Sequence, residues 1–509
     1  MSHNAFPDTG VDIADTDIDA DVVADFLAAA RDWAYRAAIV HNGSPISYRE
    51  LAERVRSTAL RCRLRRSGRG GATGRVGVLV SHHPAVVEHL LGTLRAGATY
   101  CPIDAALPVA RRHSLAAAIG LDRIGPPDTD PNEVDSVLPL MLWHQNDQAY
   151  VLCTSGSTGR PKPVVVSRHA LTVTVRALRE LFALTPQDRV LQFSSLGWDT
   201  CLEEILPAVT AGATLVFDDA AYCGTFPPFV RMLADQEITV LDLPTAFWHE
   251  LVLFLHEEHA SLPDSVRLVV IGGERVDPTR LRQWRGLNTG QVRLLNTYGC
   301  TETTMITHAV QLSGPGTEPD VAALEAEAPL GRSLPHVGDR LTDEGELLVS
   351  GPSLATGYLG LPELTAKAFP VVDLGSGPTR WFHTGDLVTR GEHGLLYAHG
   401  RADEQVKIRG VRVHPAEVEA QLNSHPAVAG VVVVGERLLG HTSLTAYVVA
   451  SGSTTQAELR RHLCQRMPSQ FVPSRVKFVA ALAYTSSGKV DRKATQRAAA
   501  DHDSKGSRP

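Results

Sequence analysis

Short apolar runs alternate with amphipathic segments through the first two thirds of the sequence. Residues 76–80, 214–217 and 266–271 are short runs containing β-branched side chains, which predict buried strands. Residues 84–95 and 245–256 instead repeat apolar side chains at helical spacing. The same two patterns predict further strands at residues 190–193, 239–243 and 292–295 and further helices at 22–38, 227–235 and 277–286. This alternation favours an α/β fold, in which mainly parallel sheets are covered by helices.

The pattern changes after about residue 330. Residues 345–351 and 394–398 are shorter β segments with glycine turns, and a compact α+β region begins at Asp403. We therefore predict a large domain over residues 1–402 and a small domain over residues 403–509. Within the small domain, the pattern predicts helices at residues 415–424 and 455–465 and strands at 428–434 and 443–449.

Composition limits the classes of protein that fit. The 509 residues are 43% hydrophobic and 21% charged, as in soluble globular proteins, and the net charge of −7 argues against nucleic-acid binding. No apolar run approaches the length of a membrane span, and the N-terminus lacks the pattern of a signal peptide. Seven scattered cysteines without a CxxC pair fit reduced thiols. We expect a cytoplasmic enzyme that binds neither nucleic acid nor membrane.

A loop rich in glycine and hydroxyl side chains follows the apolar run at residues 149–152. Glycines allow a backbone to turn tightly, and successive N–H groups and hydroxyls form a concave donor site for phosphate. The nearby lysine adds a cation, although its position does not match a Walker A loop. The loop therefore predicts a phosphate site built from Thr154, Ser155, Gly156, Ser157, Thr158, Gly159 and Lys162.

Six further stretches are similar to motifs of the amino-acid adenylation domains of nonribosomal peptide synthesis. They run in the order of that family and extend over nearly the whole chain. They are LRAGATYCPID (94–104), NTYGCTETT (296–304), HTGD (383–386), GRADEQVKIRG (400–410), MPSQFVP (467–473) and SSGKVDRK (486–493). The resemblance implies a large domain with parallel-sheet α/β subdomains and a β subdomain, followed by a small mobile α+β domain.

The resemblance also implies a reaction in which a substrate carboxylate attacks the α-phosphate of ATP and expels pyrophosphate. Fixed cations and Mg²⁺ favour that reaction because negative charge develops on the phosphate oxygens. Lys489 is expected to bridge the substrate carboxylate and the phosphates, with Lys162 on the outgoing phosphates. Glu302 is expected to bind Mg²⁺, which prefers oxygen ligands. The expected cofactors are thus ATP and Mg²⁺.

The rest of the nucleotide site is carried over from the same resemblance. Tyr298 is expected to stack on adenine and Asn296 to face its amino edge, while Asp386 binds the ribose hydroxyls with Arg401 nearby. Asp403 is expected to be the hinge about which the small domain turns between the two reaction steps. The remaining predicted ATP-binding residues are Gly273, Glu274, Gly299 and Thr301.

The predicted substrate pocket is unusually acidic. Asp199 aligns with the family's aspartate for the α-ammonium group, although it could instead cap the helix that follows. Glu203 and Asp242 are costly in an apolar pocket unless they meet a cation, which favours a basic substrate, lysine or a lysine-like amino acid. β-Lysine, ornithine and arginine remain open, as does a structural partner for either carboxylate. The resemblance, through the family's pocket pattern, implies both acidic residues and a remaining lining of Thr200, Val270, Gly272, Thr297, Met305 and Ile306.

The resemblance predicts transfer of the activated amino acid to the phosphopantetheine thiol of a carrier protein. Only about twenty residues follow Lys489, so we expect a freestanding enzyme that loads a carrier on another chain, with a small MbtH-like activator as a further candidate partner. Two alternatives stay open. One is an acyl-CoA or amide ligase of the same superfamily, and the other is a catalytically dead scaffold.

Overall fold

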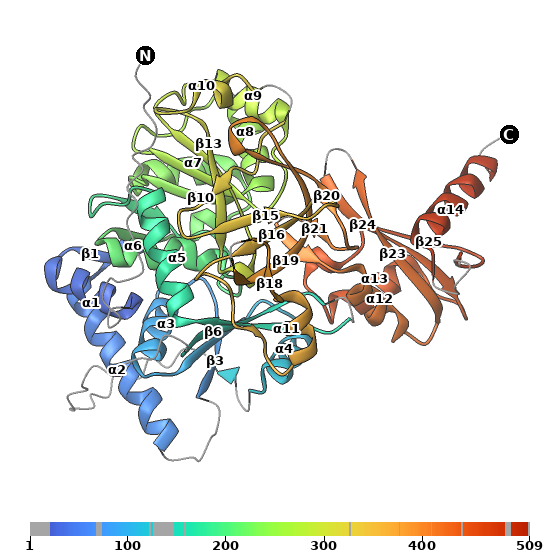
Figure 1. Ribbon diagram of the computed structural model, residues 1–509, viewed down its shortest axis with the longest axis horizontal. Helices are drawn as coiled ribbons and strands as arrows, with labels where there is room; N and C mark the ends of the chain where they lie inside the picture. The colour runs from blue at the N-terminus through green and yellow to red at the C-terminus, as the bar shows by residue number, and fades with distance from the viewer. Residues whose placement is uncertain are drawn as a thin grey trace.

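The computed structural model describes residues 21–67, 74–121, 124–125, 147–156, 159–324, 327–375, 377–408, 410–438, 441–483 and 490–506. Three large sheets precede residue 402, and two small sheets follow it. Figure 1 shows the later part of the chain, from β21 to α14, projecting from one side of the earlier part. This arrangement agrees with the predicted α/β class.

The largest sheet has nine strands, and its centre is parallel. Strands β1, β9, β8, β10, β11 and β12 pair in parallel, whereas β2, β13 and β14 add antiparallel edges. The strands are β1 (Ala37–His41), β2 (Ser44–Ser47), β8 (Arg189–Leu191), β9 (Thr214–Phe217), β10 (Val240–Pro244), β11 (Leu268–Gly272), β12 (Arg293–Gly299), β13 (Ile306–Ser313) and β14 (Arg332–Ser333). The strands predicted at residues 190–193, 214–217, 239–243, 266–271 and 292–295 therefore form, with small shifts at their ends.

Helices cover both faces of this sheet because its strands are apolar on both sides. On β10, Val240 packs into the core that includes α5 and α6, whereas Leu241 packs into the core of α7, α8 and α9. Asp242 therefore points to the same side as Val240, towards α6. The surrounding helices are α1 (Val22–Asp32), α5 (Arg168–Leu181), α6 (Thr200–Ala211), α7 (Phe226–Asp235), α8 (Thr245–Glu257), α9 (Pro278–Gly286) and α10 (Pro319–Ala322).

One predicted helix is too long. The helix expected at residues 22–38 ends at Asp32, and Ala37–His41 forms strand β1. The reason is tertiary: Ala38 and Ile39 are fully buried, and the strand pairs in parallel with β9. A short apolar run beside a helix cannot be assigned from its pattern alone.

The second sheet carries the phosphate loop. Its six strands have the order β17-β7-β6-β4-β3-β5, with β3, β4, β5 and β6 in parallel and β7 antiparallel to β6. Its elements are β3 (Arg75–Val80), β4 (Thr99–Asp104), β5 (Ile124–Gly125), β6 (Gln148–Thr154), β7 (Lys162–Ser167) and β17 (Gly357–Tyr358), with helices α2 (Tyr48–Ser67), α3 (Ala85–Arg95) and α4 (Val109–Ile119).

The remaining sheets are antiparallel or small. The five-stranded sheet contains β15 (Gly338–Leu341), β16 (Glu346–Ser350), β18 (Val371–Asp373), β19 (Pro378–Arg390) and β20 (Leu396–Arg401), beside α11 (Pro362–Ala368). After it come the hairpin β21 (Val406–Ile408) and β22 (Val411–Val413) and a sheet of β23 (Val428–Leu438), β24 (His441–Ala450) and β25 (Arg475–Phe478). Helices α12 (Pro415–Asn423), α13 (Gln456–Cys464) and α14 (Arg492–Gly506) accompany them.

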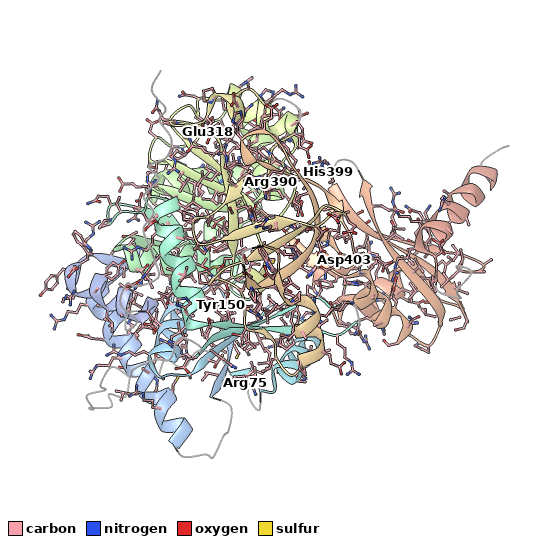
Figure 2. All side chains as sticks on the ribbon, in the orientation of Figure 1. Arg75, Tyr150, Glu318, Arg390, His399 and Asp403 are labelled. Atoms are coloured by element: carbon pink, nitrogen blue, oxygen red, sulfur yellow. The ribbon has the colours of Figure 1, made fainter. Side chains whose placement is uncertain are left out.

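The small region has a core of its own, in which side chains of α12 and α13 pack against β23 and β24. Asp403 lies at its junction with the larger region, as Figure 2 shows. Over the described residues, none of the helices is both long and apolar enough to cross a membrane.

Candidate active site

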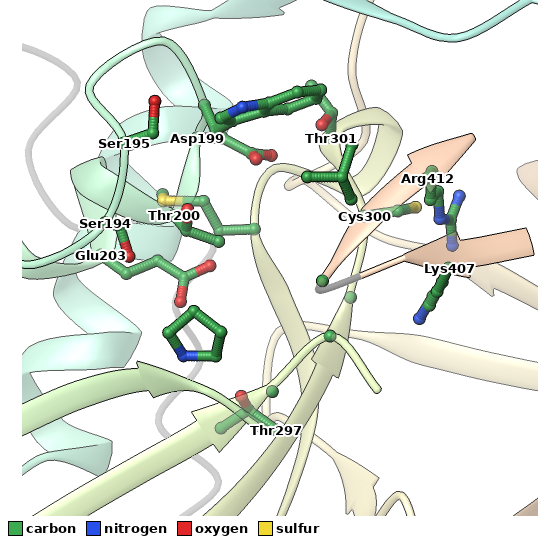
Figure 3. A pocket seen from close by; sticks show the side chains of 18 of the residues that line it. Ser194, Ser195, Asp199, Thr200, Glu203, Thr297, Cys300, Thr301, Lys407 and Arg412 are labelled. Atoms are coloured by element: carbon green, nitrogen blue, oxygen red, sulfur yellow. The ribbon is translucent and has the colours of Figure 1, made fainter. Parts of the chain in front are cut away.

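A cavity of about 310 Å³ opens at the carboxyl ends of β10, β11 and β12, where ligands bind in open α/β sheets. Figure 3 shows Asp199 and Glu203 on one side of it and Lys407 and Arg412 on the other. Its lining contains many of the predicted residues: Thr154, Ser155, Asp199, Thr200, Glu203, Asp242, Gly272, Gly273, Thr297, Gly299, Thr301, Met305 and Ile306. The structure thus brings residues from separate segments of the chain to one place.

The phosphate loop is the turn of a β-hairpin. Thr154 at the end of β6 pairs with Lys162 at the start of β7. A side chain at Gly156 would place its Cβ 2.1 Å from the carbonyl oxygen of Arg160, and Gly159 has a φ of +76°. The tight turn therefore requires glycine at both positions. Ser157 and Thr158 lie outside the described residues.

Glu302 sits beside this loop with one carboxylate oxygen in use. Its Oε1 accepts hydrogen bonds from Thr154 Oγ1 and Tyr358 Oη, both at 3.2 Å, while Oε2 is buried without a partner among the described residues. Burial alone would raise the pKa of Glu302, but Lys162 and Arg412 bring it below its usual value. The carboxylate is therefore ionised and has a free oxygen.

That arrangement fits a magnesium ion held jointly with phosphates. Mg²⁺ in nucleotide sites is commonly bound through one or two carboxylates and the substrate phosphates rather than by a complete protein cage. The described residues contain no group of three or more His, Cys, Asp or Glu side chains placed to hold a metal. Glu302 is the residue that would contribute the carboxylate.

Asp199 is a buried carboxylate at the start of α6. Within the described chain its side chain makes no capping hydrogen bond, and its Oδ2 has no partner. Burial raises its pKa to about 6, opposed by a hydrogen bond from Thr301. The capping role left open by the sequence is therefore not what the structure shows, and the carboxylate is available to a ligand.

Glu203, in the first turn of α6, and Asp242, on β10, lie next to each other in the cavity lining. Their carboxyl groups are close enough to interact directly. Burial, together with their mutual repulsion, raises the pKa of Glu203, and burial raises that of Asp242. Oδ2 of Asp242 has no partner within the described part of the chain. The pair has room for a cationic group.

Asp386 is the centre of a second polar cluster. Its Oδ1 accepts a hydrogen bond from Arg401 at 2.5 Å, and its Oδ2 accepts one from the Tyr298 hydroxyl at 2.6 Å. Arg401 also pairs with Asp403, at 2.6 Å from Nε to Oδ1. The predicted ribose residue, its arginine and the predicted hinge residue are thus directly connected.

Several predicted residues do not line this cavity, and Val270, Asn296 and Glu274 are three of them. Val270 is on the same face of β11 as Gly272 but one pleat deeper, and its side chain is fully buried in the core. Asn296 is buried and donates a hydrogen bond to the carbonyl oxygen of Pro329 at 2.7 Å. Glu274 accepts a hydrogen bond from the backbone N–H of Gly410 at 2.7 Å, and so joins the two domains.

Two functional side chains were missed from the sequence. Lys407 and Arg412, on the hairpin β21–β22, line the cavity. The Lys407 ammonium lies 5.4 Å from the Tyr298 ring centre, and burial lowers its pKa to about 8. The available signal was the cluster of Lys407 and Arg412 directly after the predicted hinge.

The predicted catalytic lysine, Lys489, lies outside the described residues. The described residues on either side of it, Ala483 and Val490, are not among those that line the cavity. The small-domain residues that do line it belong to β21–β22 and its turn, together with Gln470. The two domains are therefore arranged with the hairpin over the site.

Comparison with known families explains this assembly of residues. A model described as AMP-binding enzyme matches residues 26–125 and 116–359, and one described as AMP-binding enzyme C-terminal domain matches residues 417–489. The chain belongs to the AMP-binding enzyme family. This AMP-binding enzyme matches, over about 90% of its own length, parts of much larger nonribosomal peptide synthetases.

Relatives of the AMP-binding enzyme include large synthases and smaller proteins. It is 38% identical over 486 residues to an isonitrile lipopeptide synthase of Streptomyces coeruleorubidus, a match that covers 91% of this chain and 32% of the relative. It is 33% identical over 499 residues to novobiocin biosynthesis protein H of Streptomyces niveus, covering 89% of this chain and 79% of the relative. The chain thus spans about a third of the first relative's length.

Solved structures support the fold of the AMP-binding enzyme. NpsA-ThdA of Klebsiella oxytoca, an artificially fused adenylation–PCP di-domain, has a TM-score of 0.78 at 23% identity and covers 90% of this chain and 94% of its own. The adenylation domain AlmE of Vibrio cholerae, in complex with glycyl-adenosine-5′-phosphate, has a TM-score of 0.76 at 23% identity, over 96% and 99%. The two-domain α/β architecture predicted from the sequence is confirmed.

Proposed function

We propose that this enzyme activates a basic amino acid, lysine or a lysine-like one, to its aminoacyl-AMP. The observation that carries the proposal is the buried pair of Glu203 and Asp242, two adjacent carboxyl groups in a cavity whose described basic side chains lie on the opposite side. A cationic substrate group is the simplest species that would satisfy both carboxylates. Asp199, on the same side of the cavity, would hold the α-ammonium group.

The first step uses groups at the other end of the cavity. Lys162, Lys489 and a Mg²⁺ ion bound through Glu302 would neutralise the phosphates as pyrophosphate departs. Asp386 would accept hydrogen bonds from the ribose, and Tyr298 would stack on adenine. These roles rest on the family motifs, and the ionised, half-used carboxylate of Glu302 supports the metal assignment.

The second step would transfer the aminoacyl group to the phosphopantetheine thiol of a carrier protein. A neighbouring cavity of about 250 Å³ supports a route for that arm, because it shares Ser195, Trp198 and Gln470 with the first cavity. Its far wall is formed by α4 and by Phe471 of the small domain. The carrier proposal also agrees with the adenylation–PCP di-domain among the structural neighbours.

Amino-acid-dependent exchange between ATP and pyrophosphate tests the first step. The panel is lysine, β-lysine, ornithine, arginine, glutamate and the uncharged lysine analogue norleucine. We expect exchange with one or more of the basic amino acids and little with norleucine. Equal exchange with norleucine would contradict the basic-substrate proposal. If the purified protein shows no exchange, the assay is repeated after co-expression with an MbtH-like protein, and continued absence would favour the scaffold alternative.

A further inference from the structure

A buried ion pair joins the two domains beside the phosphate loop. Nη1 of Arg111, on α4, lies 2.5 Å from Oε1 of Glu417, in the first turn of α12. Their side chains are only 11% and 1% exposed, and the Arg111 guanidinium also lies 5.6 Å from the centre of the Phe471 ring. A pair so thoroughly removed from water is costly unless both charges are satisfied. It is therefore a specific feature of this domain arrangement.

Helix α12 rests directly on the phosphate loop. A Cβ added at Gly159 would lie 2.8 Å from the Cβ of Ala420 and 3.9 Å from the Cα of Glu417. Burial raises the pKa of Glu417, although Arg111 and the nearby Lys162 each act to lower it. Its ion pair with Arg111 therefore holds the Glu417 carboxylate beside the cations of the site expected to hold the outgoing phosphates.

The helix does not fill that site. A cavity of about 120 Å³ remains beside Lys162, lined by Thr154, Ser155, Glu302 and Arg412 among others. Glu417 does not line this cavity, but it interacts with Lys162, which does, and its Oε2 has no partner among the described residues. Pyrophosphate bound beside Lys162 would therefore add negative charge near Glu417. Helix α12 would thus oppose bound pyrophosphate by electrostatic repulsion from Glu417 rather than by occupying its space.

On this basis, and resting on the adenylation function proposed above, we propose that Glu417 is a positioning residue that takes the place of the departed pyrophosphate. Its carboxylate holds the small domain on Arg111, beside Lys162, once the β- and γ-phosphates have left. While those phosphates remain, repulsion from Glu417 keeps the domain away. Transfer would thus follow adenylation because the Glu417 carboxylate can take its place beside Lys162 only after pyrophosphate has left.

A cross-linking reporter in the full chain tests the inference without a carrier protein. Arg160 and Ala420 are exposed on either side of the Gly159 contact, so both are changed to cysteine, with the exposed Cys223 and Cys464 changed to serine. A short bis-maleimide then measures how often α12 rests on the loop. The reaction is timed with and without magnesium pyrophosphate.

We expect pyrophosphate to slow cross-linking about tenfold, a typical coupling between two sites. Adding Glu417→Gln should remove most of that effect. Glu419→Gln is the matched control, because Glu419 lies on the same helix but pairs with Arg492 inside the small domain. Arg111→Gln should slow cross-linking in the absence of pyrophosphate, and Arg111→Lys should restore it in part.

Equal suppression by pyrophosphate in the parent reporter and in its Glu417→Gln variant would overturn the proposal, as would an absence of cross-linking under all conditions. Amino-acid-dependent exchange, measured in the same reporter before the cross-linker is added, tests adenylation separately. A reporter that lacks exchange but keeps the pyrophosphate effect would contradict the proposed function and leave the role of Glu417 supported.

Discussion

Arg412 of the small domain donates a hydrogen bond from Nη2 to Oδ2 of Asp386 over 3.2 Å. Asp386 is the residue predicted to bind the ribose, so the hairpin reaches the predicted nucleotide site. Because Arg412 can make this contact only when the hairpin covers the site, Arg412→Ala should slow the transfer of the aminoacyl group to a pantetheine thiol about tenfold. Exchange between ATP and pyrophosphate should fall by a smaller factor.

The comparison variant is Arg412→Lys, which keeps the charge but not the planar donor pair. It should lie between wild type and Arg412→Ala in the transfer assay. An equal loss in both steps for Arg412→Ala would show that the hairpin arrangement is not particular to transfer.

Lys489 should be required for the first step. Lys489→Ala should abolish adenylate formation with the basic amino acid, because the charge that forms on the phosphates loses its counter-ion. The measurement is exchange between ATP and pyrophosphate, with circular dichroism to confirm an unchanged fold. Exchange near the wild-type rate would remove Lys489 from the catalytic group.

Activity should depend on the ionisation of Asp199. Its pKa of about 6 is above its ordinary value of 3.8, so the native protein keeps this proton to a higher pH than the unfolded chain does. An ammonium ligand needs the ionised form, so kcat/KM for the amino acid should fall as the pH drops below about 6. A pH profile of the exchange reaction checks this.

The same raised pKa of Asp199 predicts that its ionisation, which activity requires, lowers the stability of the fold. Above pH 6 the buried, ionised Asp199 destabilises the fold relative to a neutral side chain. Asp199→Asn should therefore abolish exchange yet raise the free energy of unfolding by about 1–3 kcal/mol at pH 7.5, and by less near pH 4.5. Denaturant unfolding at the two pH values measures the difference.

Glu203 and Asp242 should each be needed for a charged substrate. Glu203→Gln or Asp242→Asn should lower kcat/KM for the preferred basic amino acid about tenfold to a hundredfold, the worth of a hydrogen bond to a charged group. Glu204→Gln is the control, since the neighbouring Glu204 is buried but accepts hydrogen bonds from the backbone N–H groups of Phe193 and Ser194. Unchanged kcat/KM in both pocket variants would contradict the basic-substrate proposal.

Gly156 should be irreplaceable in the phosphate loop. In Gly156→Ala the new methyl group would meet the Arg160 carbonyl oxygen at 2.1 Å, which the hairpin turn can relieve only by moving. The KM for ATP should rise about tenfold or more as the loop is displaced. Gly290→Ala provides the control, because a Cβ at Gly290 would meet nothing within 4 Å.

The sequence predicted those features that depend on residues close together in the chain. Strand β9 begins and ends as predicted, and Asp242 lies near the end of a strand, beside strands that carry Gly272 and Thr297 at their ends. Motifs with fixed spacing predict such positions because each residue's place depends on the strand or helix in which it lies. Val270 was predicted to line the pocket, but its side chain is buried in the core, two residues before Gly272 on the same strand. The apolar pattern of a buried strand does not show which of its side chains reaches a cavity.

Contacts between the domains could not be predicted in this way. Arg111 and Glu417 are 306 positions apart, and nothing in either local pattern distinguishes a buried partner from a solvent-exposed charge. Lys407 and Arg412 line the cavity only because the small domain places the hairpin over it, and this arrangement could not be predicted from the sequence. Similarly, strand β1 is identified by its pairing with β9. The sequence pattern alone predicted that the first helix continues through residues 37 and 38.

The ladder that joins β10, β11 and β12 has a consequence for how such enzymes change substrates. Backbone pairing fixes the strands whatever their side chains, so Asp242 can be exchanged without disturbing the sheet. Gly272 and Thr297 are different: they are direct partners in the ladder, and a Cβ at Gly272 would lie 2.6 Å from the Thr297 hydroxyl. A new preference can therefore arise by a change at the acidic position alone, whereas any side chain at Gly272 also requires a change at Thr297.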